Sequence, residues 1–228
     1  MNTDAILGKE DCEVARTPEE LIAWIESLDA AEGYVRADER IVKAFFEEIR
    51  PLGHLACHKY RGRLGFYLRP KIGNQNYDAE MIDMSSGNER IMRIEFTSTY
   101  RDENLALRQE YLSQHGDVYM TGSVWRDGTK ASGGQVQVHP DFVDHTILLD
   151  KLLVACFERV AGKLAKDYEP GTVLAIVFDD TILYPTDMPR LTPYFRDMLS
   201  KQALGKFCGL FILGASGRTF LEFGATDP

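Results

Sequence analysis

Residues 77–99 read YDAEMIDMSSGNERIMRIEFTST and contain the pattern on which the fold depends. Apolar and polar residues alternate on both sides of Ser85-Ser86-Gly87-Asn88, which is typical of two half-buried strands. So short a connection requires the strands to pair as an antiparallel hairpin. With the turn centred near Gly87, Asp78 on the first strand lies beside Glu95 on the second, within one residue of register. The stretch therefore predicts two neighbouring carboxylates near one edge of a sheet.

Helices and further strands are expected before this hairpin. Thr17 begins an N-terminal helix with a capping box, and a second helix is predicted over residues 37–50. Pro51 should close the second helix. The apolar period then changes to two, so residues 54–60 and 64–68 are predicted to be strands. Together with the hairpin they would form an antiparallel meander.

The chain after the hairpin alternates between helical and strand patterns. The expected elements are a helix from Asp102 to Leu112, strands near 117–125 and 135–139, a helix over 144–167, a strand over 172–178, a helix over 192–204 and a hairpin over 207–223. The helix over 144–167 is so rich in apolar residues that we expect it to pack on the sheet rather than to form a dimer surface. The continuous apolar run over 172–178 predicts a central strand covered on both faces.

These elements predict an α/β (α+β) fold, with a mixed central β-sheet flanked by helices. A length of 228 residues suits one domain, 1–228, with a substantial core. Within it we expect an N-terminal helical extension (1–35), a core (37–180) and a C-terminal helix and hairpin (181–228).

Composition and charge limit the partners. Asp and Glu number 35 against 26 Lys and Arg, a net charge of -9, so no overall positive field draws the protein to nucleic acid or to an anionic membrane. No stretch has the roughly 18–20 consecutive apolar residues of a membrane helix. Acidic residues interrupt the first 16 positions, which argues against a signal peptide. We therefore expect a cytoplasmic protein with no membrane partner.

The paired carboxylates of the hairpin suggest a metal site. Alternation places Glu95, Thr97 and Thr99 on one face of their strand and the apolar residues on the other. Adjacent carboxylates repel one another, and a cation relieves that repulsion; hard oxygen ligands suit Mg²⁺. Mg²⁺ held by Asp78 and Glu95 would favour phosphodiester hydrolysis and would lessen the need for a basic surface.

The order of elements and the two acids resemble the PD-(D/E)XK nuclease superfamily over residues 37–180. An acid-bearing helix, a strand meander, Asp78 opening one strand and Glu95 on the next are similar to the αβββαβ restriction-endonuclease-like core. Thr97 stands where the family has its motif lysine. The resemblance implies that Asp78 and Glu95 bind Mg²⁺. It also implies that Thr97 replaces the lysine that, in the family, orients the attacking water.

Further roles follow from the resemblance alone. Glu47 or Glu48 resembles the acid of the family's first helix, and Gln109 resembles a polar residue on the helix after the third strand. The motif lysine needs a substitute in this chain, because Thr carries no charge. The candidates are Lys59, Lys71 and Arg93.

Two functions remain open from the sequence. The first is a Mg²⁺-dependent nuclease-like protein that hydrolyses DNA, and the alternative is a catalytically inactive module of the same fold that binds a protein partner. Two other signals receive structural interpretations. Asp179 and Asp180 are similar to a phosphatase motif, but their spacing favours acids that end a strand, and Asp144 is expected to cap a helix.

Overall fold

The computed structural model describes residues 7–31, 37–99, 103–118, 123–129, 132–141, 143–181, 183–201 and 204–224. Its centre is a six-stranded sheet with the order β1-β2-β3-β6-β7-β8. The strands are β1 (Phe66–Pro70), β2 (Ala79–Asp83), β3 (Arg90–Ser98), β6 (Thr172–Phe178), β7 (Phe207–Gly214) and β8 (Phe220–Gly224). The β3–β6 and β6–β7 pairs are parallel and the others antiparallel, so the sheet is mixed, as predicted.

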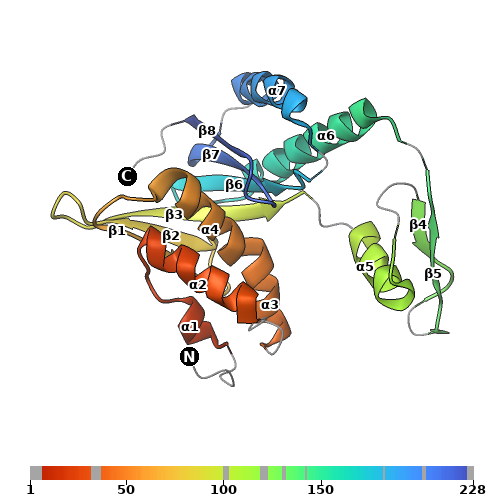
Figure 1. Ribbon diagram of the computed structural model, residues 1–228. Coiled ribbons are helices and arrows are strands. Elements are labelled where there is room, and N and C mark those ends of the chain that lie inside the picture. Colours follow the sequence, from red (N-terminus) through yellow and green to blue (C-terminus); the bar gives the residue numbers. More distant parts are fainter. Residues whose placement is uncertain are drawn as a thin grey trace.

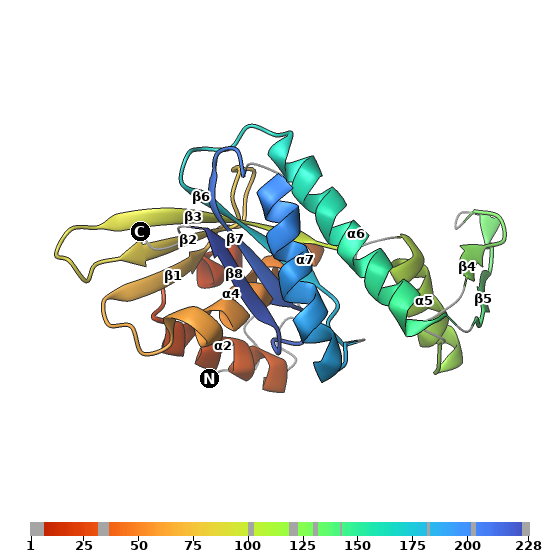
Figure 2. The same cartoon turned by 90° about the horizontal axis from the view of Figure 1, so that it is seen from above.

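Helices cover both faces of the sheet (Figures 1 and 2). One layer contains α1 (Lys9–Cys12), α2 (Pro18–Ala31), α3 (Glu39–Ala44) and α4 (Arg50–Leu55), with π-helical turns η1 (Phe45–Ile49) and η2 (Ala56–Tyr60). The other contains α6 (His145–Leu164) and α7 (Met188–Lys201), the latter preceded by the 3-10 turn η4 (Pro185–Asp187). The mixed α/β class expected from the sequence is therefore confirmed.

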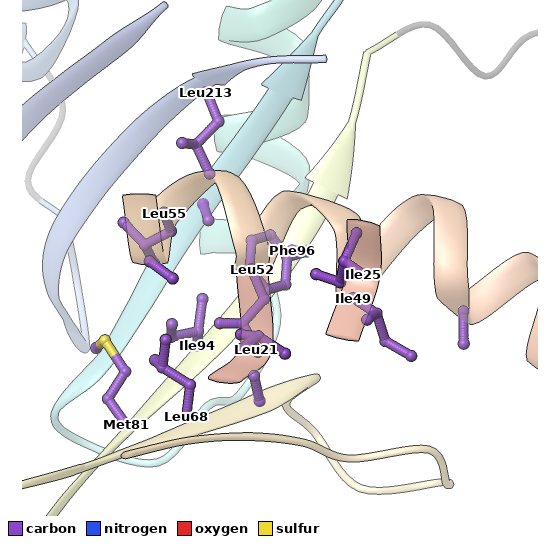
Figure 3. Packing of buried hydrophobic residues seen from close by; sticks show 14 of the residues in the cluster. Leu21, Ile25, Ile49, Leu52, Leu55, Leu68, Met81, Ile94, Phe96 and Leu213 are labelled. Atoms are coloured by element: carbon purple, nitrogen blue, oxygen red, sulfur yellow. The ribbon is translucent and has the colours of Figure 1, made fainter. Parts of the chain in front are cut away.

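The central strand β6 shows why the sheet needs two helical layers. Val173, Ala175 and Val177 belong to the core beneath α2 and α4, while Leu174, Ile176 and Phe178 belong to the core beneath α6 and α7. Every residue of β6 is buried, as its continuous apolar run predicts. Figure 3 shows the first core, in which α2 and α4 side chains meet those of β1, β2, β3 and β7.

The prediction for residues 54–60 was wrong. They form no strand, because the helix that begins at Glu39 continues through η1, α4 and η2 to Tyr60. Leu52, Leu55, Ala56 and Tyr60 are fully buried at helical spacing, which outweighs the short alternation of apolar and polar residues. Pro51 does not end the helix, because it lies within the first turn of α4, directly after the π-helical turn.

An outlying unit interrupts the core between β3 and α6. It consists of α5 (Glu103–His115), β4 (Ser123–Arg126) and β5 (Val136–His139). β4 and β5 pair antiparallel as a separate sheet, and α5 packs against both strands. Figures 1 and 2 both show this unit beyond the end of β3, apart from the six-stranded sheet. Among the described residues, no helix is long and apolar enough to cross a membrane.

Several local predictions are confirmed. Thr17 and Glu20 form the capping box of α2, since each backbone N–H donates to the other's side chain. Asp144 caps α6 by accepting from the Thr146 N–H at 2.7 Å. Asp180 is buried at the end of β6 and accepts from both the backbone and the hydroxyl of Ser216, a structural role.

Candidate functional site

The two predicted carboxylates lie together at the edge where β2 begins. Ala79 pairs with Ile94, and continuing this register by one residue sets Asp78 opposite Glu95. The Asp78 backbone N–H donates to Ile94 O at 2.8 Å, and Asp78 Oδ2 accepts from the Phe96 N–H at 2.7 Å. The hairpin register inferred from the sequence therefore places both acids as expected.

A cavity of about 220 Å³ surrounds these acids. Four structural elements contribute to it: the π-helical turn η1, the residue before β2, the end of β3 and the last turns of α6. Its lining residues are Glu47, Glu48, Asp78, Glu95, Phe96, Thr97, Ser98, Arg159 and Lys163. The cavity thus combines acidic side chains from η1, β3 and the residue before β2 with two cationic side chains from α6.

Glu95 is buried and anchored by two donors. Its Oε1 accepts from Lys163 Nζ and from the Tyr168 hydroxyl, the latter at 3.2 Å. Burial, together with the negative charge of Glu95, raises the pKa of Tyr168, so its hydroxyl stays protonated and remains a donor. The Lys163 ammonium offsets part of the cost of burying the Glu95 carboxylate.

Two of the other acids, Glu48 and Asp78, have raised pKa values. Burial raises the pKa of Glu48 to about 8, and the negative charges of Asp78 and Glu95 add to the effect. Burial and the Glu95 charge raise the pKa of Asp78 to about 7, against the opposing influence of the Phe96 N–H and Lys163. Such mutual repulsion is characteristic of carboxylates grouped where a cation or a shared proton is needed.

The structure distinguishes among the other predicted residues. Thr97, Glu47 and Glu48 all line the cavity, and burial and the Asp78 charge raise the pKa of Glu48. Gln109 falls within α5, and its side chain lies outside the described residues.

None of the suggested lysine substitutes lines the cavity. Lys59 Nζ pairs with Glu222 at 2.6 Å, and Arg93 Nη1 pairs with Glu169 at 2.6 Å. Lys71 follows β1, and its backbone N–H donates to Asp78 O at 2.8 Å.

Sequence reasoning missed Lys163. Its position on α6 offers a signal: it lies seven residues after the buried Cys156 and three after the buried Val160, hence on the sheet side of the helix. A lysine on the buried side of a helix needs an acidic partner, and Arg159 lies one turn before it, towards the same cavity.

Asp78 and Glu95 are the two residues of the cavity that could hold a magnesium ion. Asp78 Oδ1 and Glu95 Oε2 accept no hydrogen bond from the described part of the chain, whereas each carboxylate's other oxygen does. No group of three His, Cys, Asp or Glu residues within that part is arranged to hold a metal ion. Mg²⁺ commonly takes one or two carboxylates and completes its octahedron with water and phosphate oxygens, so two ligands suffice.

Comparisons of the chain with protein-family models, with curated proteins and with solved structures gave no match.

Proposed function

We propose that this chain is a divergent PD-(D/E)XK nuclease that hydrolyses phosphodiester bonds of DNA with Mg²⁺ bound at Asp78 and Glu95. One observation carries the proposal: both acids share a cavity with Lys163 and Arg159. A nuclease of this kind needs carboxylates for the metal and a cation for the phosphate, and this cavity offers both.

The order of elements supports the same assignment. The helix spanning residues 39–60 precedes three antiparallel strands, α6 follows them, and β6 then adds parallel to β3. This order supports the proposed resemblance to an αβββαβ core. The outlying unit of α5, β4 and β5 is inserted after β3, close to the end of the strand that carries Glu95.

Each side chain has a role that follows from its position. Asp78 Oδ1 and Glu95 Oε2 would hold Mg²⁺, which supplies the polarisation of the phosphodiester and the acidification of the attacking water. Lys163 pairs with Glu95 and presents its ammonium to the same cavity, so it would take the part of the motif lysine for which Thr97 has no charge. Arg159, one turn away, is placed to bind a phosphate oxygen.

The net charge of -9 is compatible with this function. Attraction to DNA would come from the bound metal ion and from two cations inside the cavity rather than from the surface as a whole. We therefore expect weak binding to DNA when Mg²⁺ is removed, and cleavage rather than tight association when it is present.

The test compares isosteric variants in a cleavage assay. Purified protein is incubated with single-stranded and double-stranded DNA in Mg²⁺, Mn²⁺ or EDTA. Asp78→Asn and Glu95→Gln should each lower the cleavage rate by at least about 100-fold, because a metal ligand is lost. Glu89→Gln, an exposed acid in the turn before β3, is the matched control and should cleave normally. Unchanged cleavage by Asp78→Asn would overturn the proposal.

A non-catalytic module that binds a protein partner is the second candidate. The Lys163–Glu95 pair favours it, since this ion pair satisfies Glu95 without any metal. Calorimetric titration with Mn²⁺ separates the two functions. Binding that disappears in Asp78→Asn supports the nuclease, whereas no binding to the wild-type protein, together with no cleavage, supports the module.

A further inference from the structure

Helix α6 carries apolar side chains on two opposite sides. Leu149, Leu153, Cys156 and Val160 face the sheet and are buried, as the sequence predicts. Ile147 and Val154 lie on the other side and remain 50% and 51% exposed, and Phe157, between the two sides, is 36% exposed. A helix that only served the core would present polar residues there. The apolar density of α6 therefore exceeds what its packing on the sheet requires.

The exposed side has an ordered pattern. Ile147, Val154 and Ala161 recur every seven residues, so they form a stripe along about four turns of the helix. Two oppositely charged residues, Lys151 and Glu158, flank the stripe on one side, again seven residues apart. Both are exposed, and neither forms an ion pair within the described part of the chain.

We propose that two copies of this chain form a symmetric dimer by pairing their α6 helices antiparallel along this stripe. A two-fold axis near Val154 brings each Val154 against its counterpart. When this axis lies midway between positions 151 and 158, and so between Val154 and Ala155, it sets Lys151 of one protomer opposite Glu158 of its partner, twice over. Ile147 then meets the segment around Gly162 of the partner, where the small residues Ala161 and Gly162 allow close approach.

A second copy is the occupant that this pattern fits best. A self-complementary arrangement of charge about a central apolar residue is what an isologous interface demands, whereas a different partner would require no such symmetry. The dimer also leaves the carboxylate cavity open, because Lys163 lies on the sheet side of α6, away from the stripe. The inference does not depend on the proposed nuclease function.

Sedimentation velocity on the full chain tests the dimer. The wild-type protein should change from monomer to dimer with rising concentration, up to about 100 µM. Lys151→Glu and Glu158→Lys should each raise the dimer dissociation constant by about tenfold or more, because two attractive pairs become repulsive. The double variant Lys151→Glu/Glu158→Lys restores opposite charges across the axis and should return the constant to within about threefold of the wild type.

Val154→Glu should abolish the dimer, because it brings two like charges together at the axis. Leu64→Glu, at a surface leucine that is 90% exposed, is the matched control and should leave the dimer intact. Circular dichroism establishes that all variants are folded. A wild-type protein that stays monomeric throughout, a dimer that survives Val154→Glu, or a double variant as weak as the single ones would each overturn the proposal.

Discussion

At the residue scale, the proposed role of Lys163 predicts how a single substitution changes the rate of DNA cleavage. Lys163→Met keeps the aliphatic stem but removes the ammonium from the cavity, so we expect the single-turnover cleavage rate at saturating Mg²⁺ to fall about 100-fold. Lys166→Met removes an exposed ammonium near the end of the same helix and should leave the rate unchanged. Thr97→Ala should cost far less than Lys163→Met. The reverse order would assign the water-positioning role to Thr97.

The pKa values of Glu48 and Asp78 predict how stability depends on pH when Mg²⁺ is removed. Both folded-state pKa values, about 8 and about 7, lie above the ordinary values of 4.5 and 3.8. The folded protein therefore binds more protons than the unfolded chain between about pH 4 and pH 8, and stability falls as pH rises. Urea unfolding in EDTA should show that the free energy of unfolding falls by several kcal/mol from pH 5 to pH 9.

Glu48→Gln is the control for this pH dependence. Glutamine stays neutral at every pH and is isosteric with the protonated glutamic acid, so the variant should lose less stability at high pH than the wild type. Glu89→Gln, at an exposed position, should follow the wild-type curve. A wild-type stability that is flat or rises between pH 6 and pH 9 would contradict the stated pKa values.

The sequence predicts the two acids of the site better than the cations. Asp78 and Glu95 are joined by a short hairpin, whose turn fixes their register locally. Lys163 reaches Glu95 from 68 positions further along the chain, so its approach depends on how α6 packs on the sheet. No local rule of spacing links these two positions, and only the helical phase of Lys163 could have suggested a buried acidic partner.

At the scale of elements, the continuous helical segment from Glu39 to Tyr60 shows where local patterns mislead. Pro51 was expected to end it, but the helix continues to Tyr60. A proline lacks an N–H, but in this chain it falls after a π-helical turn, where the hydrogen-bonding register already changes. Gly53 lets α4 approach Ile25 of α2 closely. Tertiary packing thus decides where this helix ends. By contrast, β6 and the 77–99 hairpin were predictable from the sequence because their apolar patterns are long and locally consistent.

The close approach of Gly214, at the end of β7, to Asp180 predicts how substitutions there change stability. A Cβ on Gly214 would collide with the Asp180 carboxylate, which is buried and held by Ser216. Gly214→Ala should therefore lower the free energy of unfolding by about 2–4 kcal/mol, measured by urea unfolding. Asp180→Ala should cost about 1–3 kcal/mol through its lost hydrogen bonds.

A double-mutant cycle tests whether this collision is the cause. In Asp180→Ala/Gly214→Ala the smaller side chain makes room for the new methyl group, so the combined loss should be clearly less than the sum of the single losses. Strictly additive losses would show that Gly214 is required for another reason.

At the scale of the whole molecule, the apolar cores and the acidic cavity have opposite effects on stability. Two apolar cores, one on each sheet face, stabilise the fold. The cavity instead concentrates negative charge in a protein that already carries a net charge of -9. Buried negative charge of this kind lowers stability, and under the proposed function this is the cost of keeping carboxylates ready for a cation.

Adding Mg²⁺ should therefore stabilise the whole chain. An ion that binds only the folded state adds about 1.4 kcal/mol when its concentration is tenfold above its dissociation constant. The gain in the free energy of unfolding should be larger at pH 8.5 than at pH 6, because protons on Asp78 and Glu48 compete with the ion at the lower pH.

Since any salt screens a net charge of -9, NaCl at equal ionic strength is the control. Thermal unfolding of wild-type and Asp78→Asn protein in both salts, before and after EDTA, measures the difference. Equal stabilisation by Mg²⁺ and NaCl would show that the ion screens charge without occupying the cavity.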